Sequence, residues 1–144
     1  MSDPMTKPSK VVHTARTRTT GGREHGISRS SDGRLDVRLA LPGSDRIGTD
    51  PEHLFATAWS ASFETAIQRA AQRMNIALSA GVVIEAEVDL NIAENDYVLS
   101  VRFAIGVPGV ARAAAESLID EARRSCPYVK ATRGNIDVAI TLLE

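Results

Sequence analysis

The feature that most constrains the fold is a stretch of apolar residues that recur at helical spacing over residues 51–75. Its start carries three helix signals, because Asp50 can cap free N–H groups, Pro51 suits the first helical position and Glu52 complements the helix dipole. Ser62 lies on or beside the apolar face. One long helix is therefore predicted at the buried centre of the fold. Its apolar positions are Phe55, Trp59, Phe63, Ala66, Ile67, Ala70 and Met74.

Runs of β-forming and alternating residues predict strands on both sides of this helix. Before it, residues 11–19 favour a strand, and residues 27–30 and 35–41 flank a turn signal and form a hairpin. After it, residues 82–92 and 97–105 form a longer hairpin. The side chains predicted to face inward on this second hairpin are Ile84, Ala86, Val88, Leu90, Ile92, Tyr97, Leu99, Val101, Phe103 and Ile105.

The C-terminal third adds a second amphipathic helix and a last strand. Residues 110–125 carry apolar side chains at helical spacing, and Cys126 follows them, just before the helix-stopping Pro127. Gly134 then leads into a strand over residues 136–143. The order is strands, helix, hairpin, helix, strand, with no repeating βαβ unit. The predicted fold class is therefore α+β with a mainly antiparallel sheet.

Length and charge exclude several classes of protein. The 144 residues favour one domain over residues 11–144, after a flexible tail over residues 1–10 that lacks the apolar stretch of a secretory signal. No apolar run approaches the roughly 18 residues that span a membrane. The formal net charge of −1 gives no field that would attract nucleic acid or anionic lipid. A cytoplasmic location follows by default.

The cysteine and histidine content excludes further kinds of site. Cys126 is the sole cysteine, so the chain can form neither a disulfide framework nor a cysteine-based zinc site. His13, His25 and His53 are scattered without metal-ligand spacing. We therefore expect no bound metal and no cofactor. Taken alone, Cys126 is a buried small apolar residue, and Ser62 is equally well explained as a helix-packing residue.

Four segments, taken together, resemble the organic hydroperoxide resistance proteins of the OsmC/Ohr family. Their order and spacing match that family from about Val12 to the C-terminus, and the last segment is the most specific. The resemblance implies an OsmC/Ohr-like intertwined homodimer with active sites at the subunit interface. The segments are residues 20–23 (TGGR), 50–56 (DPEHLFA), 59–63 (WSASF) and 126–138, which contains CPY and ATRGNIDV.

The resemblance also implies a thiol peroxidase that acts on organic hydroperoxides in oxidative stress defence. In the family, a cysteine thiolate attacks the O–O bond, a second cysteine forms a disulfide with it, and a dithiol such as a protein-bound lipoyl group reduces that disulfide. Arg23 matches the arginine that stabilises the thiolate, Glu52 the carboxylate that holds this arginine, and Cys126 the resolving cysteine. Trp59 and Phe63 are core residues first and are candidates to line an apolar pocket for the substrate's alkyl chain.

The chain departs from the family pattern at two places. Glu24-His25-Gly26 follows Arg23 where the family has Asp-Gly, and Ser62 stands where the family has the attacking cysteine. A serine hydroxyl is hardly ionised at neutral pH, is a poor nucleophile toward peroxide oxygen and cannot form a sulfenic acid. This polypeptide is therefore predicted to be inactive as a thiol peroxidase.

Three explanations of Ser62 stay open. The residue can be an engineered replacement in an active organic hydroperoxide reductase. It can instead mark a natural non-catalytic relative that binds a lipid-like or hydroperoxide ligand in the interfacial pocket. The third explanation is a hydrolase with Ser62 as nucleophile, although His53 lies about 13 Å away along a continuous helix. Glu52 lies about 15 Å from Ser62 on the same helix, so we expect the partner subunit to supply one side of the site.

Overall fold

A computed structural model describes residues 10–143, which form two compact units, one ending at Asp50 and one beginning at Pro51. The predicted tail over residues 1–10 lies, apart from Lys10, outside the described residues. Helices and strands are mixed along the chain, and the strands pair mainly antiparallel, which confirms the α+β prediction. That residues 11–144 form one domain stays a prediction.

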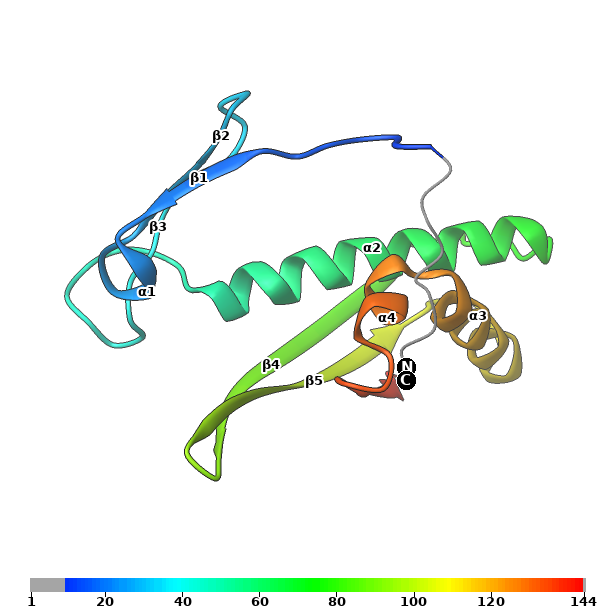
Figure 1. Cartoon of the computed structure of the whole chain (residues 1–144). Coiled ribbons are helices and arrows are strands. Elements are labelled where there is room, and N and C mark those ends of the chain that lie inside the picture. The colour runs from blue at the N-terminus through cyan, green and yellow to red at the C-terminus, as the bar shows by residue number, and fades with distance from the viewer. Residues whose placement is uncertain (1–9, 144) are drawn as a thin grey trace. The chain divides into compact units, whose positions relative to one another are not determined.

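The N-terminal unit holds one small antiparallel sheet. In chain order its elements are β1 (Thr17–Thr20), α1 (Gly22–His25), β2 (Ile27–Ser30) and β3 (Asp36–Arg38) (Figure 1). The strand predicted over residues 11–19 is wrong for residues 11–16. The reason is that the four residues of β2 pair with Thr17–Thr20 on this side, so residues 11–16 have no neighbouring strand among the described residues. High β-propensity does not form a strand without a partner.

The predicted hairpin between β2 and β3 is confirmed. Asp32 holds its turn, because the carboxylate accepts hydrogen bonds from the Ser30 hydroxyl and from the Arg34 backbone N–H. These two bonds hold the pKa of Asp32 below its usual value. Gly33 follows with a φ of +75°, a left-handed conformation that glycine adopts without strain.

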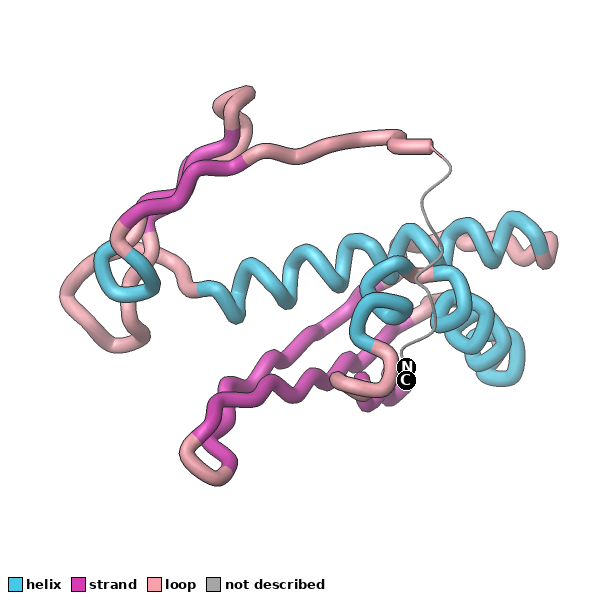
Figure 2. The backbone as a smooth tube through the Cα atoms, in the orientation of Figure 1, coloured by secondary structure: helices cyan, strands magenta, loops and turns pink. Residues whose placement is uncertain are grey.

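The second arm of this hairpin is shorter than the predicted residues 35–41. Leu39, directly after β3, forms an isolated bridge to Thr49 instead of extending the pairing with β2. Leu41, at the end of the predicted arm, is 39% exposed. The chain then continues as a loop up to the start of the next helix (Figure 2).

The C-terminal unit contains a long helix, a long hairpin and a helical crossover to a third strand. Its elements are α2 (Pro51–Arg73), β4 (Val83–Ala93), β5 (Asp96–Gly106), α3 (Arg112–Ser125), α4 (Pro127–Thr132) and β6 (Val138–Leu142). β4 and β5 are antiparallel neighbours, and β6 lies beside β5 and runs parallel to it. The parallel pairing follows from the connection, since α3 and α4 carry the chain back along the sheet before β6 begins.

The predicted central helix is confirmed as α2. It begins at Pro51, as the start signals indicate, and ends at Arg73, slightly before the predicted end. Asn75 has a φ of +54°, which no helix can continue through. Met74 was expected on the apolar face, but it is 41% exposed because it lies beyond the last helical residue.

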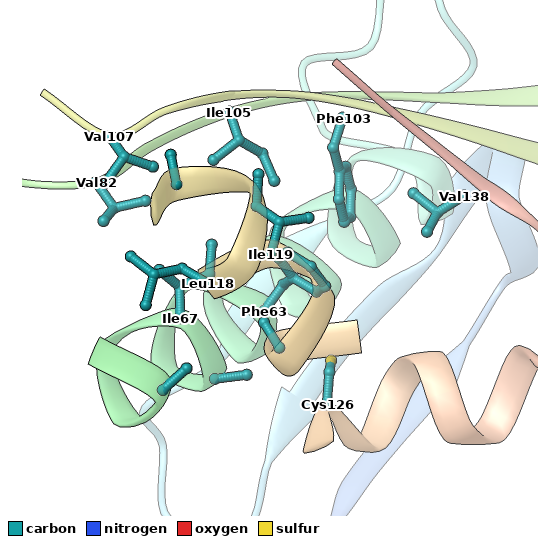
Figure 3. Packing of buried hydrophobic residues seen from close by; sticks show 14 of the residues in the cluster. Phe63, Ile67, Val82, Phe103, Ile105, Val107, Leu118, Ile119, Cys126 and Val138 are labelled. Atoms are coloured by element: carbon teal, nitrogen blue, oxygen red, sulfur yellow. The ribbon is translucent and has the colours of Figure 1, made fainter. Parts of the chain in front are cut away.

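The core forms where α2 packs against the β4–β5 hairpin and α3. Trp59 and Phe63 both contact Phe103 of β5, with ring centroids 5.5 and 5.7 Å apart. α3 contributes Leu118 and Ile119 to the same cluster (Figure 3). The largest fully buried side chains are Trp59, Phe63, Phe103, Ile67, Ile105, Leu118, Val101 and Cys126.

The end of the β4–β5 hairpin near its turn is not covered by its own unit. The side chains near the hairpin turn were predicted to face inward, and within this unit that prediction is wrong. The helices of the unit cover the hairpin at the end away from the turn and leave the turn end uncovered (Figure 1). Ile92 and Tyr97 are 72% and 65% exposed, while Ile84, Ala86 and Val88 are half-buried as expected. We call the exposed group the hairpin-tip patch; it consists of Leu90, Ile92 and Tyr97, which lie on one face of the hairpin.

The other face of the hairpin is polar, as the alternation predicts. Arg102 on β5 donates hydrogen bonds to Glu87, at 2.7 Å, and to Asp89. The bonds from Arg102 and then from Ser100 lower the pKa of Asp89. These side chains are solvated, so their ion pairs add little to stability.

Pro127 ends α3 as predicted, but it also begins α4, which the sequence analysis did not predict. Proline is favoured at the first helical position because its missing N–H has no partner there in any helix. α4 is too short for its periodicity to show in the sequence. Gly134, with a φ of +78°, then turns the chain toward β6, which starts at Val138 rather than at Ile136.

Phe103→Ala is expected to lower the free energy of unfolding by about 3–5 kcal/mol, because it removes a ring that two other rings contact in a closed core. Urea titration followed by circular dichroism measures this loss. Val83→Ala is the control, at a β4 position that is 51% exposed, with an expected change within about 0.5 kcal/mol. Equal losses for the two variants would contradict the packing described.

Candidate active site

Ser62 and Cys126 are distant in sequence and touch in the structure. The Ser62 hydroxyl oxygen lies 3.7 Å from the Cys126 sulfur, within hydrogen-bond range for a thiol. Ser62 belongs to α2, and Cys126 lies between α3 and α4. The contact therefore joins the middle of the central helix to the junction between the two C-terminal helices.

The junction between α3 and α4 fixes the position of the Cys126 thiol. The Cys126 N–H donates to the Ala122 carbonyl at 2.9 Å, and the Cys126 carbonyl accepts from the Lys130 N–H at 3.1 Å. Its own backbone is extended, with φ −67° and ψ 123°, so one helix stops and the next begins at this residue. Cys126 is fully buried in the core cluster (Figure 3).

The two contacting groups limit the chemistry of the site. A hydroxyl and a thiol can share a hydrogen bond, but they cannot form a redox couple. A thiol at position 62 would instead bring two sulfur atoms into contact, and a modest approach would reach the disulfide bond length of about 2.0 Å. That Ser62 holds the attacking position and Cys126 the resolving position stays a prediction.

Aromatic side chains lie on α2 on both sides of Ser62. Trp59 precedes Ser62 by nearly one turn and Phe63 follows it directly, and both are completely buried. Trp59 also contacts Phe55, with ring centroids 5.6 Å apart. Trp59 and Phe63 are thus core residues, and their role in lining a substrate pocket stays a prediction.

Arg23 lies in α1 of the N-terminal unit, and the shape of this short helix depends on Gly21. Gly21 has a φ of +86°, and a Cβ there would lie 2.6 Å from the His25 carbonyl oxygen. A residue with a side chain would therefore clash with the helix that carries Arg23. The pair Gly21-Gly22 thus starts this turn of helix. The role of Arg23 toward a thiolate stays a prediction.

Glu52 and His53 lie in the first turn of α2. Because α2 is unbroken, ten residues place Glu52 about 15 Å from Ser62 along the axis (10 × 1.5 Å). The helix start therefore does not fold back to bring Glu52 to Ser62. His53 is about 13 Å from Ser62 on the same axis, too far for a hydrogen bond between them within one chain. The role of Glu52 stays a prediction.

Residues 10–143 contain neither a candidate metal site nor a helix that could span a membrane. In that range no group of three or more histidine, cysteine, aspartate or glutamate side chains could hold a metal ion. The helices described there are all too short or too polar to cross a membrane. The chemical groups found at the site are a hydroxyl, a thiol and aromatic rings.

Sequence reasoning missed α4 and the groups that it places beside Trp59. Thr132 and Arg133 line a cavity of about 300 Å³ that Trp59 and Arg123 also border. The available signal was Pro127 as a helix start with Gly134 as a helix stop, a pair that marks a short helix as well as a loop.

Relatives of known name match nearly the whole chain. A family model described as OsmC-like protein matches residues 42–141. The organic hydroperoxide resistance protein of Xanthomonas axonopodis pv. citri is 40% identical over 142 residues, which cover 96% of this chain and 99% of that protein. The organic hydroperoxide resistance protein OhrA of Bacillus subtilis is 35% identical over 141 residues, which cover 94% and 99% of the two chains.

Solved structures share the fold. The crystal structure of the organic hydroperoxide resistance protein OhrB of Bacillus subtilis superposes with a TM-score of 0.85 at 34% identity, covering 92% of this chain and all of that one (100%). An organic hydroperoxide resistance protein from Legionella pneumophila gives a TM-score of 0.86 at 34% identity, with 94% of this chain covered. With sequence, motif order and fold in agreement, the chain belongs to the OsmC/Ohr family.

Proposed function

We propose that this chain descends from organic hydroperoxide reductases and that Ser62 leaves it without the thiol that attacks the peroxide. The observation that carries the proposal is the 3.7 Å contact between the Ser62 oxygen and the Cys126 sulfur. Family membership and the names of the relatives support the peroxide-defence lineage. The family resemblance assigns the attacking position to Ser62 and the resolving position to Cys126.

The proposed reaction of the lineage has three steps. A thiolate at position 62 attacks one peroxide oxygen, the O–O bond breaks, and the alcohol leaves after taking a proton. The resulting sulfenic acid condenses with the Cys126 thiol to a disulfide and releases water. A dithiol, such as a lipoyl group on a protein partner in the cytoplasm, then reduces the disulfide and is itself oxidised. Ser62 cannot perform the first step, so neither the sulfenic acid nor the disulfide forms.

Arg23 and Glu52 are proposed to prepare the attacking thiolate. A guanidinium near a thiol favours its ionised form, and a carboxylate that binds the guanidinium fixes its direction. Since about 15 Å of helix separates Glu52 from Ser62, one arginine must bridge the two positions or a second subunit must supply part of the site. We favour the second subunit.

A homodimer is the arrangement we propose for the site. The hairpin-tip patch supports it, because three large apolar side chains on one face of the hairpin end are between 42% and 72% exposed. Contiguous exposed apolar side chains of this kind mark surfaces that a partner covers.

A non-catalytic binding protein is the second candidate function. A cavity of about 300 Å³ in the C-terminal unit favours it, because a chain without the attacking thiol still keeps a ligand-sized space there. A serine hydrolase is disfavoured, since His53 cannot reach Ser62 on the same chain.

Ser62→Cys is expected to create dithiol-dependent reduction of cumene hydroperoxide, because it restores the missing thiol beside Cys126. The parent chain is expected to show no turnover above a blank. Consumption of the hydroperoxide with dihydrolipoamide as reductant measures the activity, and peptide mass spectrometry after one oxidation detects a bond between positions 62 and 126.

The matched control carries Ser62→Cys together with Cys126→Ser. It should consume one equivalent of hydroperoxide and form a sulfenic acid, but no disulfide within the chain. If Ser62→Cys forms no such disulfide and shows no turnover, position 62 is not the attacking position and the lineage proposal fails.

A charge in the hairpin-tip patch is expected to weaken the dimer. The variant Ile92→Asp/Tyr97→Asp should sediment mainly as a single chain, whereas the parent should sediment at twice the chain mass. Val83→Asp places the same charge at an exposed position at the other end of β4, and it should stay dimeric. A parent chain that sediments as a monomer at every concentration would exclude the shared site.

A further inference from the structure

Arg46 belongs to the loop that follows β3, and backbone contacts close this loop (Figure 2). The Thr49 N–H donates to the Arg38 carbonyl at 2.8 Å, and the Ala40 N–H donates to the Thr49 carbonyl at 2.9 Å. Gly48 passes close to the end of β3, where a Cβ on this residue would lie 2.7 Å from the Arg38 carbonyl oxygen. Arg46 therefore extends from a loop that is tied to β3 on both sides.

The half-buried Arg46 guanidinium donates to three backbone carbonyls of the N-terminal unit. Its Nε donates to the Leu39 carbonyl at 2.9 Å. Its Nη2 donates to the Gly26 carbonyl at 3.1 Å and to the His25 carbonyl at 3.4 Å. A planar guanidinium holds several acceptors at once with donors in a fixed fork, whereas a lysine presents a single nitrogen and cannot span them.

Two of these three carbonyls belong to the turn that carries Arg23. α1 covers Gly22–His25, and Gly26 is its C-cap residue. The turn joins β1 to β2, whose Thr20 and Ile27 pair at its base. A helix of four residues has little stability of its own, so contacts from outside the helix decide its conformation. The Arg46 fork supplies two such contacts, two and three residues after Arg23.

The same turn is one of the places where the sequence departs from the family pattern. Glu24-His25-Gly26 follows Arg23 in place of Asp-Gly, so the turn is one residue longer. A longer turn has more conformations to lose when it is ordered. The fork of Arg46 binds the carbonyls of the last two of these three residues.

We propose that Arg46 is a positioning residue for Arg23. Its bonds to the His25 and Gly26 carbonyls hold the α1 turn in one conformation, and this conformation directs the Arg23 side chain. Coulomb attraction falls with distance, so a cation on a loose turn stabilises a thiolate less than a cation that is held in place. The inference rests on the proposed function, because it adds a support for the role that Arg23 is given there.

The experiment measures the pKa of a thiol at position 62. The Ser62→Cys/Cys126→Ser chain carries this thiol alone, and the pH dependence of its alkylation by neutral iodoacetamide gives the pKa. Adding Arg23→Gln should raise the thiol pKa by about one or more, because a cation is lost. Adding Arg46→Gln should raise it by about half of that. Arg46→Lys should also raise it, since lysine keeps the charge and loses the fork.

A double substitution tests whether Arg46 acts through Arg23. The thiol pKa of Arg23→Gln/Arg46→Gln should equal that of Arg23→Gln alone, because a positioning residue has no effect once the residue that it positions is gone. Arg29→Gln is the matched control in the same unit, since Arg29 pairs with Asp36 on an exposed surface at 3.1 Å. Its thiol pKa should match the background chain.

Each part of the inference has an outcome that would overturn it. Additive pKa increases for Arg23→Gln and Arg46→Gln would show that Arg46 acts by its own charge, and so would an increase in Arg46→Gln with none in Arg46→Lys. An unchanged pKa in both Arg46 variants, beside an increase in Arg23→Gln, would overturn the inference and leave the proposed function standing. An unchanged pKa in Arg23→Gln would overturn the role of Arg23 and the inference together.

The folded state of each variant is verified by a cooperative unfolding transition in circular dichroism. If Arg46→Gln does not fold, Arg46→Lys takes its place in the single and double substitutions, because it keeps the charge of the loop. A loss of stability alone would lower the unfolding midpoint and leave the thiol pKa of the folded chain unchanged, so the pKa separates positioning from a merely structural role.

Discussion

Burial of one face of α2 is the interaction on which the C-terminal unit depends. Trp59 and Phe63 of α2 pack against Phe103 of β5. The apolar face of α3 packs against α2 as well. Because these contacts fix both α2 and α3, they also fix the distance between a residue in the middle of one helix and a residue at the end of the other. The Ser62–Cys126 contact is thus a result of core packing, and a sulfur pair at these positions would inherit a geometry set by apolar side chains.

Local periodicity was sufficient to predict most elements, and it failed where a partner decides the structure. The α2 helix and the long hairpin follow from their 3.6- and 2-residue patterns. Residues 11–16 have a strand-like composition, but no strand lies beside them within residues 10–143. Ile92 and Tyr97 follow the predicted alternation, yet they stay 72% and 65% exposed. A sequence pattern predicts which side chains of an element share a face. It does not predict which other element packs against that face, because this depends on the tertiary structure.

The sequence was sufficient to name the candidate site residues, but not to predict which of them lie in contact. The family resemblance assigned roles to Ser62 and Cys126, but no spacing rule places two residues so far apart in contact. The distance between Glu52 and Ser62 along the helix axis was predictable, because an unbroken helix has a fixed rise per residue and α2 is continuous. The short helix α4 could not be predicted, because its six residues are too few for a periodic pattern to show.

The parallel pairing of β6 with β5 imposes an order on the synthesis of the chain. β6 cannot dock until the whole connection through α3 and α4 has left the ribosome, so the outer edge of β5 waits with unpaired N–H and C=O groups. Pairings that close such a long connection form late and expose strand edges while they wait. A chain that lacks β6 (Val138–Leu142) is therefore expected to expose this edge of β5 and to be prone to self-association.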